Sequence, residues 1–538
     1  MCISVQQLCY IHADKEPLFQ DISLTVNKGE QLSLVGNNGS GKSTLLRIIE
    51  GSLKPSSGEV VCSSKPYYVP QHFGQYDQLT VVQALLVESK INALHAIIAG
   101  DASADNFTVL DDDWNIEERS LAALSSWGLE HIRLNQSMST LSGGEKTKVY
   151  LAGIQIHSPE IILMDEPTNH LDVNSRKKLY SFIESSRATM LIVSHDRTLL
   201  NLLPYTCELE RSKITLYGGN YDFYKEQKEV VLTALQNQLS EKEKELRLAK
   251  KIARETLERK SKSSVRGEKA AIKKGIPRIM MGAMKQHAEQ STVKLKDIHD
   301  EKMGSINSTI TDIQNTLPDM KQMKTDFNSP NLHTGKILIT VKDMNFGYGQ
   351  DGLWKEPLNL QVRSGDRIQF SGNNGAGKTT LLKLLLGELE PTEGTITRAD
   401  FKYVYIDQEY SIVKPHLTVF EQLEQFNLFA KPEHELKMIL SRFLFPVGTW
   451  DKNCSKLSGG EKMRLAICCL MVSNSTPDIF VLDEPTNNLD IRSVSIITAA
   501  IKDYNGTVLL VSHDLYFVKE IKINRFVELF SSTPVIKI

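Results

Sequence analysis

The chain has 538 residues, enough for two or three domains of ordinary size. Its apolar content of 41%, charged content of 24% and net charge of −2 are typical of a globular protein and do not by themselves indicate a nucleic-acid partner. No apolar run approaches the ~20 residues of a membrane helix and no signal peptide is apparent, so we expect a cytoplasmic protein without membrane insertion. The 7 cysteines form no C-x-x-C pair, which favours free thiols over a zinc site.

Four sequence motifs occur twice, in the same order, in the two halves of the chain. The copies are GNNGSGKSTLL from position 36 and GNNGAGKTTLL from 372, LSGGEK from 141 and 457, DEPTNHLD from 165 and DEPTNNLD from 483, and VSHD from 193 and 511. Such self-similarity predicts a duplicated domain, over 1–220 and 333–538. The first copy carries ~20 more residues ahead of LSGGEK, which indicates a helical insertion at about 85–120.

The string from Gly36 to Ser43 matches the phosphate-binding loop pattern GxxxxGK[ST]. It follows a strand-like run at 31–35 and precedes a helix-like run at 44–49, which is the context that such a loop requires. Glycines let backbone N–H groups turn toward phosphate at a helix N-terminus. We expect Lys42 to reach the β- and γ-phosphates of ATP and Ser43 to hold Mg²⁺. The candidate ATP-binding residues of the two loops are Gly36, Asn37, Asn38, Gly39, Ser40, Gly41, Lys42, Ser43, Thr44, Gly372, Asn373, Asn374, Gly375, Ala376, Gly377, Lys378, Thr379 and Thr380.

Two acids follow a short apolar run in each copy. A buried strand that ends in two carboxylates supplies one group for Mg²⁺ and another for the attacking water. Asp165 and Asp483 fit the first role, whereas Glu166 and Glu484 fit the second as general bases or water positioners. Because both copies place these acids identically, a chance pair of exposed acids is a weak alternative.

The segment 221–332 between the copies has few aromatic residues and long helix-favouring runs. Leucines at 232, 235, 239 and 246 and isoleucines at 306, 310 and 313 recur at helical spacing, which predicts two antiparallel helices paired along these stripes. Gly267, Gly275 and Pro277 interrupt the pattern, so we expect a turn near 262–282.

The end of this helical hairpin is strongly basic. Residues 246–285 hold 13 Lys/Arg and 3 Asp/Glu, a local net charge of about +10 that favours contact with RNA phosphates over a merely solvated face. The candidate RNA-binding residues are Lys262, Arg266, Lys269, Lys273, Lys274, Arg278 and Lys285. The apolar residues Ile276, Ile279, Met280, Met281 and Met284 either pack inside the hairpin end or contact RNA bases or a bound drug.

These motifs together resemble the ABC ATPase family, and the resemblance covers both domains. It implies an α/β fold of two P-loop ABC-type nucleotide-binding domains joined by a long α-helical hairpin linker, with ATP and Mg²⁺ as ligands. Gln71 and Gln408 look like the glutamines that sense Mg²⁺ and the attacking water. Asp172 and Asp490 look like the loops that link the two sites, and His195 and His513 look like the switch histidines at the γ-phosphate.

In that family the LSGGE loop acts on the opposite domain. The resemblance therefore implies that Ser142, Gly144 and Glu145 cap the ATP held by Lys378. In the same way, Ser458, Gly460 and Glu461 would cap the ATP held by Lys42. Tyr348 looks like the adenine-stacking residue of the second copy, with His12 or Tyr10 in the first. We expect a monomer with intramolecular pairing of the cassettes and two hydrolytic sites.

Tandem cassettes, DEPTNHLD and a charged linker resemble the ABC-F branch of the family. That branch implies a factor that binds the ribosome, its rRNA and tRNA, near the exit site and the peptidyl-transfer centre. The ATP-bound closed form would bind and hydrolysis would release it, in antibiotic-resistance ribosome protection or in translation regulation. Two alternatives are the ATPase pair of a transporter with separate membrane domains and a DNA-linked ABC ATPase. The basic hairpin disfavours the first, and its place between two complete cassettes disfavours the second.

Overall fold

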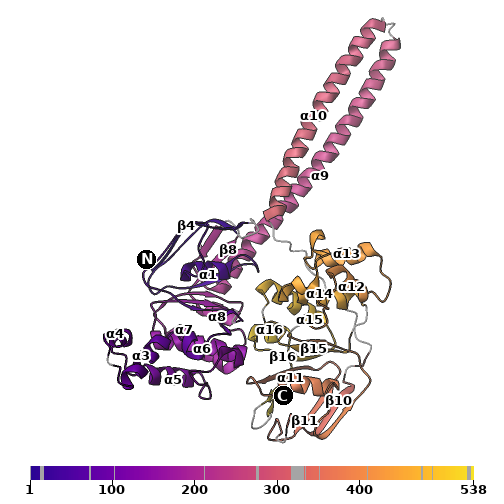
Figure 1. The fold of residues 1–538 in the computed structure, drawn as a ribbon. Coiled ribbons are helices and arrows are strands. Elements are labelled where there is room, and N and C mark those ends of the chain that lie inside the picture. The colour runs from indigo at the N-terminus through magenta and orange to yellow at the C-terminus, as the bar shows by residue number, and fades with distance from the viewer. Residues whose placement is uncertain are drawn as a thin grey trace. The chain divides into compact units, whose positions relative to one another are not determined.

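The structure is a computed structural model of the whole chain. It describes residues 2–11, 17–71, 74–101, 103–210, 213–273, 278–316, 332–333, 335–349, 352–408, 410–473, 477–487, 489–529 and 535–537. These residues form two α/β cassettes and two long helices (Figure 1). The chain divides into two compact units, one made of Met1–Asp222 with Met323–Ile538 and the other of Phe223–Gln322.

The first cassette is built on a six-stranded sheet in the order β5-β6-β7-β3-β8-β9, parallel except for its last pair. Its strands are β3 (Gln31–Val35), β5 (Tyr67–Val69), β6 (Ile161–Asp165), β7 (Thr189–Val193), β8 (Tyr205–Glu210) and β9 (Lys213–Tyr217). A three-stranded antiparallel sheet is formed by β1 (Ile3–Ile11), β2 (Pro17–Val26) and β4 (Ser57–Cys62). Strands β6 and β7 are buried along their whole length, as their continuous apolar sequences require.

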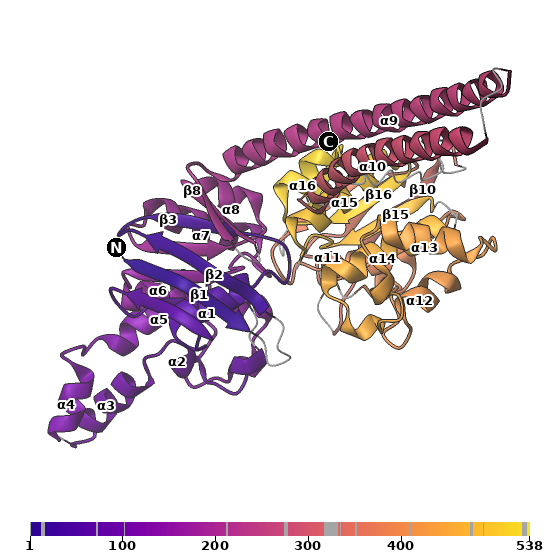
Figure 2. The same cartoon turned by 90° about the horizontal axis from the view of Figure 1, so that it is seen from above.

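The helices of the first cassette follow its strands. They are α1 (Lys42–Glu50), α6 (Gly143–His157), α7 (Val173–Ser185) and α8 (Arg197–Leu202). The segment ahead of LSGGEK adds α2 (Val81–Ala84), α3 (Glu88–Ile98), α4 (Ala104–Leu110) and α5 (Ile116–Ser126). Helices α3 and α4 lie at the margin of the cassette in both views (Figures 1 and 2), where extra residues leave the central sheet unchanged.

The second cassette repeats this topology. Its six-stranded sheet has the order β14-β15-β16-β12-β17-β18, with the phosphate-loop strand again in fourth place. The strands are β10 (Ile337–Asn345), β11 (Leu358–Arg363), β12 (Arg367–Gly372), β13 (Glu393–Arg398), β14 (Tyr403–Ile406), β15 (Ile479–Asp483), β16 (Thr507–Val511), β17 (Arg525–Leu529) and β18 (Val535–Lys537). The helices are α11 (Lys378–Leu386), α12 (Val419–Gln425), α13 (Glu433–Arg442), α14 (Gly459–Val472), α15 (Ile491–Asp503) and α16 (Leu515–Glu520). The duplication read from the motifs therefore extends to the fold.

The linker consists of α9 (Tyr221–Lys273) and α10 (Arg278–Thr316), which run side by side in both views (Figures 1 and 2). Ala253 on α9 and Ile306 and Ile310 on α10 are buried, whereas the four leucines of the expected stripe on α9 are half-buried. The expected turn at 262–282 was too wide, because α9 continues through Gly267. One glycine costs a helix only about 1 kcal/mol, which its helix-favouring neighbours offset. Gly275 and Pro277 lie outside the described residues. Within the described part of the chain, no helix has the length and apolar character needed to cross a membrane.

Candidate ATP sites in the two cassettes

Each phosphate loop wraps around the amino group of its own lysine. Lys42 Nζ donates hydrogen bonds to the carbonyls of Gly36 at 2.9 Å and Asn37 at 3.1 Å. In the second loop, Lys378 Nζ donates to Gly372 at 2.9 Å and Asn373 at 3.0 Å. Both lysines are buried at the first turn of a helix, which brings their charge to the N-terminus where phosphate binds.

The glycine that precedes each lysine is required by the geometry of the loop. Gly41 has φ 95°, and a Cβ there would lie 2.8 Å from Leu18 Cδ2. Gly377 has φ 82°, and its Cβ would lie 2.3 Å from Leu353 Cδ2. Only glycine combines a left-handed conformation with such close packing. The loop is therefore held tightly enough for its N–H groups to remain aimed at a phosphate.

A carboxylate and a hydroxyl meet beside Lys378. Thr379 donates its hydroxyl proton to Asp483 Oδ2 at 2.7 Å, and Tyr405 donates to the same oxygen at 3.2 Å. Asp483 Oδ1 is buried and has no hydrogen-bond partner among the described residues. Burial raises the pKa of Asp483 against the opposing effect of the two hydrogen bonds. An unsatisfied oxygen in an all-oxygen donor set fits Mg²⁺, with Gln408 also lining the site.

The first cassette has the matching acid at Asp165. It ends β6, is almost completely buried and accepts a hydrogen bond from the Tyr68 hydroxyl at 3.3 Å. Ser43 stands in α1 directly after Lys42, and Gln71 lies two positions after Val69, the last residue of β5. The two tyrosines were not anticipated from the sequence, although each precedes the glutamine of its copy by three positions, Tyr68 before Gln71 and Tyr405 before Gln408.

Glu166 and Glu484 stand in the same unusual backbone conformation. Each has φ 51°, a left-handed value that costs free energy in any residue but glycine. Their N–H groups donate to Val193 and Val511, both at 2.8 Å. The strain is therefore balanced by bonds to the neighbouring strand, and it turns both carboxylates toward the switch histidines.

The histidine backbone holds each of these carboxylates. His195 N–H donates to Glu166 Oε2 at 3.1 Å, and His513 N–H donates to Glu484 Oε2 at 3.4 Å. The second oxygen, Oε1, lies 3.3 Å and 3.2 Å from the respective imidazole Nε2 atoms and has no hydrogen bond among the described residues. Oε1 is thus a buried carboxylate oxygen that can accept a further hydrogen bond.

The protonation states of the glutamate and the histidine in each site are set mainly by burial. Burial and the neighbouring Asp483 raise the pKa of Glu484 to about 7, against the effects of Arg176 and Lys378. Burial and Asp165 likewise raise the pKa of Glu166. Burial and the phosphate-loop lysines lower the pKa of His195 and of His513, so both imidazoles are neutral. A carboxylate whose pKa lies near the working pH is suited to act as a general base.

A cavity of about 760 Å³ joins the second phosphate loop to the LSGGE loop of the first cassette. The first cassette lines it with Ser142, Gly144, Glu145, His170, Asp172 and Arg176. The second lines it with Tyr348, Lys378, Thr379, Gln408, Asp483, Glu484 and His513. Two hydrogen bonds close the contact, from Asn374 Nδ2 to the His170 carbonyl at 2.9 Å and from Asn174 Nδ2 to Asn373 Oδ1 at 3.1 Å. The residues that the resemblance assigned to one composite site thus lie together.

The linking aspartates approach both sites from the opposite cassette. Asp172 interacts electrostatically with Lys378 and His513, and Asp490 does so with Lys42 and His195. Each aspartate also caps the helix that follows it, accepting from Ser175 N–H at 2.8 Å or Ser493 N–H at 2.7 Å. The caps hold the carboxylates in place across the interface.

The LSGGE motif has a local function in addition to its place at the cavity. Ser142 caps α6 and receives the carboxylate of Glu145 on its own N–H at 2.8 Å, while Ser458 and Glu461 form the same capping box on α14 at 2.8 Å. Each glutamate therefore stiffens its loop. Gly460 follows Ser458 in the first turn of α14.

The expected adenine platform is exposed. Tyr348 is 77% exposed, donates or accepts a 3.0 Å hydrogen bond with Thr380 Oγ1, and meets Phe346 edge to face. An open ring at the rim of the cavity can stack on a base. In the first cassette His12 lies outside the described residues, whereas Tyr10 packs against Phe19 with ring centroids 6.1 Å apart.

Comparison with known proteins accords with this geometry. Residues 19–169 and 356–487, more than half of the chain, match the family described as ABC transporter. "ABC transporter F family member 2" of Arabidopsis thaliana is 30% identical over 543 residues, covering 95% of this chain and 74% of that relative. This chain is a tandem ABC ATPase of the ABC-F type. "Probable ATP-binding protein YbiT" of Escherichia coli O157:H7 is also 30% identical, over 94% of this chain and 92% of its own length.

The fold of the ABC-F chain is found among solved structures. A complex of the archaeal ribosomal stalk protein aP1 with the archaeal ribosome recycling factor aABCE1 matches with a TM-score of 0.57 and 19% identity, over 97% of this chain and 87% of the matched chain. That likeness concerns the arrangement of tandem cassettes. The family confirms that the protein binds and hydrolyses ATP, and Glu166 and Glu484 hold positions from which each cassette could direct water at a γ-phosphate.

Proposed function

We propose that this ABC-F ATPase is a cytoplasmic factor that binds the ribosome when ATP closes its cassettes and leaves when ATP is hydrolysed. The cavity between Ser142 and Lys378 carries the first half of the proposal, because a nucleotide there would touch both cassettes. ATP then acts as a bridge between the cassettes. Its hydrolysis to ADP and phosphate removes the γ-phosphate, which the LSGGE loop of the opposite cassette would hold.

Within each site we infer the following roles. Lys42 and Lys378 bind phosphate, and the serines and glycines of the LSGGE loops cap it from the other cassette. Mg²⁺ would be held by Ser43, Asp165 and Gln71 in one site and by Thr379, Asp483 and Gln408 in the other, where it would neutralise phosphate charge. Glu166 and Glu484 orient and deprotonate water, while His195 and His513 face the γ-phosphate.

The helical hairpin carries the second half of the proposal. Its basic residues are concentrated at 246–285, and Lys262 and Arg266 are exposed to solvent on α9. Lys269, Lys273, Arg278 and Lys285 belong to the same helices, and Lys274 lies outside the described residues. A dense cluster of cations on a long helical hairpin suits the phosphates of rRNA and tRNA, and a cassette that only couples to membrane domains has no need of it. The solved neighbour, an archaeal ribosome recycling factor in complex with a ribosomal stalk protein, supports a ribosomal partner.

The decisive experiment uses the Glu166→Gln, Glu484→Gln double variant. It should bind ATP without hydrolysing it and co-sediment with ribosomes in ATP but not in ADP, whereas the wild-type protein should sediment weakly in both. Equal sedimentation of the double variant in ATP and ADP would disprove ATP-gated binding. Recovery with membranes instead of ribosomes would support the transporter alternative.

A second experiment separates ribosome protection from general regulation. Wild-type protein should restore translation in a cell-free system that is inhibited by an antibiotic of the peptidyl-transfer centre, if its function is protection. A factor that regulates translation should change the rate without antibiotic and leave the inhibition unaltered. Expression of wild-type protein in sensitive cells, with the hydrolysis-deficient variant as control, tests the same difference in vivo.

A further inference from the structure

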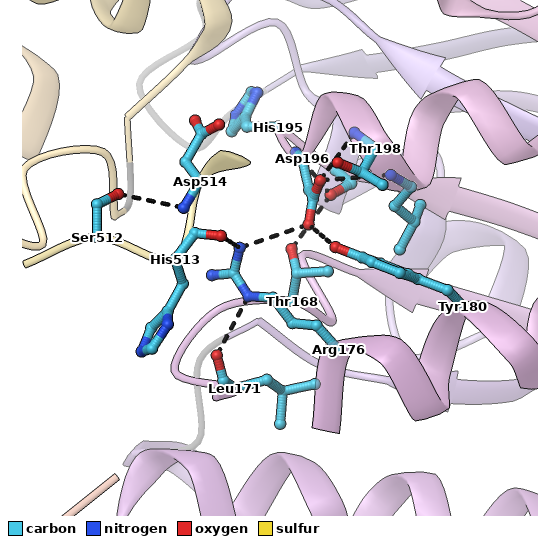
Figure 3. A network of polar contacts seen from close by, with 12 residues as sticks. Thr168, Leu171, Arg176, Tyr180, His195, Asp196, Thr198, Ser512, His513 and Asp514 are labelled. Carbon is cyan, nitrogen blue, oxygen red and sulfur yellow. Dashed lines mark hydrogen bonds and ion pairs between the residues drawn. The ribbon is translucent and has the colours of Figure 1, made fainter. Parts of the chain in front are cut away.

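One arginine of the first cassette connects the switch loops of both cassettes. Arg176 lies in the first turn of α7, is 9% exposed, and has its Nε bonded to the Leu171 carbonyl at 3.1 Å. Its NH1 lies 3.5 Å from Asp196 Oδ2 and 3.5 Å from the His513 carbonyl. Figure 3 shows the guanidinium between these two groups. Asp196 directly follows His195, so Arg176 touches the loops of both switch histidines.

The partners of Arg176 are themselves held in place. Asp196 caps α8 by accepting from Thr198 N–H at 2.9 Å, and it also accepts the hydroxyl proton of Tyr180 (Figure 3). On the other side, the His513 N–H donates to Glu484 Oε2 at 3.4 Å. A shift of Arg176 would therefore be passed through the backbone of one residue, His513, to the Glu484 carboxylate. Arg176 also interacts electrostatically with Glu484 and lines the cavity at Lys378.

The second cassette has no arginine at the equivalent place. Helices α7 and α15 both follow the DEPTN-x-LD motif, whose last aspartate caps the helix. Arg176 lies four positions after the capping Asp172. Val494 lies four positions after the capping Asp490. Val494 is 5% exposed and belongs to the apolar core of its cassette. The duplication thus supplies a guanidinium to the site at Lys378 and a valine at the matching position beside the site at Lys42.

The neighbouring helix repeats this asymmetry. After the VSHD motif the first cassette has Arg197 and the second has Leu515. Arg197 reaches across to Glu520 at 3.1 Å and Ser495 at 3.3 Å, whereas Leu515 is exposed. The two equivalent acids, Asp196 and Asp514, interact electrostatically, and the positive charges that oppose this effect at Asp514 come from Arg197 and Arg176. The first cassette supplies both charges.

We propose that Arg176 is a positioning residue that acts on the opposite cassette by holding the His513 loop in register with the Asp196 loop. Hydrolysis at the Lys378 site then depends on the state of the first cassette. The two ATP sites are therefore unequal. This inference rests on the ATPase activity and does not require ribosome binding. The guanidinium has two discrete partners, one in each switch loop, which is the arrangement needed to couple two sites.

The test removes the guanidinium in two backgrounds that each leave one site able to hydrolyse ATP. Glu166→Gln leaves only the Lys378 site able to hydrolyse ATP, and Glu484→Gln leaves only the Lys42 site able to do so. Single-turnover hydrolysis of prebound ATP is measured in each background with and without Arg176→Val, which copies the residue of the second cassette. We expect the rate at the Lys378 site to fall about tenfold or more, as for the loss of a buried charged hydrogen-bond donor, and the KM for ATP to change less than about twofold. The Lys42 site should lose less than about twofold.

Two further variants distinguish positioning from general weakening. Arg176→Lys keeps the charge but not the forked geometry, so it should recover part of the rate at the Lys378 site. Arg197→Leu removes the other inter-cassette arginine and should affect both backgrounds alike. Thermal unfolding and binding of a non-hydrolysable ATP analogue check that each variant is folded. An equal loss in both backgrounds for Arg176→Val, or an unchanged rate at the Lys378 site, would overturn the proposal.

Discussion

Asn374, in the second phosphate loop, donates a 2.9 Å hydrogen bond to the backbone carbonyl of His170, which belongs to the first cassette. Gly144 of the LSGGE loop lies beneath this bond, because a Cβ built on it would be 2.6 Å from the same carbonyl oxygen and 3.3 Å from Asn374 Nδ2. The LSGGE loop is thus packed against the backbone of His170 in its own cassette and against the Asn374 side chain of the phosphate loop. Such packing leaves room for a glycine and for no other residue.

We expect Gly144→Ala to reduce ATP hydrolysis by roughly tenfold or more, because the added methyl group would push the His170 carbonyl away from Asn374. The measurement is steady-state ATPase activity together with thermal unfolding. Gly460→Ala is the matched control, since its Cβ would meet the Ser493 side chain of its own cassette at 2.9 Å. A loss of activity for Gly460→Ala that exceeds the loss for Gly144→Ala would contradict this account of the interface.

Replacing Glu166 and Glu484 together with glutamine should slow hydrolysis by at least about a hundredfold, because the general base is removed from both sites. ATP binding should remain, since neither carboxylate holds the phosphate loop. Phosphate release and fluorescent-nucleotide binding measure the two quantities. Glu160→Gln, which removes an exposed carboxylate paired with Lys28, is the control and should leave both unchanged. Hydrolysis by the double variant near the wild-type rate would place the base elsewhere.

Removal of divalent cations with EDTA should abolish hydrolysis, and readdition of Mg²⁺ should restore it. Thr379→Ala should raise the Mg²⁺ concentration needed for half-maximal activity more than Tyr405→Phe does. The threonine hydroxyl lies 2.7 Å from Asp483 Oδ2 and is a proposed ligand, whereas the tyrosine only orients the carboxylate from 3.2 Å. Each variant is titrated with Mg²⁺ at saturating ATP. The assignment fails if Tyr405→Phe has the larger effect.

Charge reversal on the hairpin should weaken ribosome binding in a position-dependent way. Lys262→Glu with Arg266→Glu changes two exposed cations within the basic segment, whereas Lys294→Glu with Lys296→Glu makes the same change in net charge on exposed positions of α10. The first pair should reduce co-sedimentation and flatten its dependence on KCl concentration, because fewer phosphates are neutralised. ATPase activity without ribosomes should stay the same. Equal losses for the two pairs would mean that only total charge matters.

The chemistry of each site was predictable because it resides in contiguous segments. A GxxxxGK[ST] string after a strand places Lys42 over its own loop, and an S-x-x-E string after a loop caps a helix with Ser142 and Glu145. These are local geometries, decided by residues a few positions apart. The helical hairpin followed from apolar periodicity, but its turn was placed too broadly, because Gly267 was weighed as a break and α9 continues through it.

What the sequence by itself determined is the pair of phosphate loops, the acids and histidines that accompany them, the family and the basic hairpin. Only the tertiary structure decided which differences between the two copies meet across the interface of the cassettes. The Arg176 guanidinium and the His513 carbonyl are 337 positions apart in the chain and meet because the two cassettes pack on each other. No periodicity or motif marks such a pair, since docking of two folded surfaces selects it. The motifs of the two cassettes are nearly the same, and the surfaces between them are not.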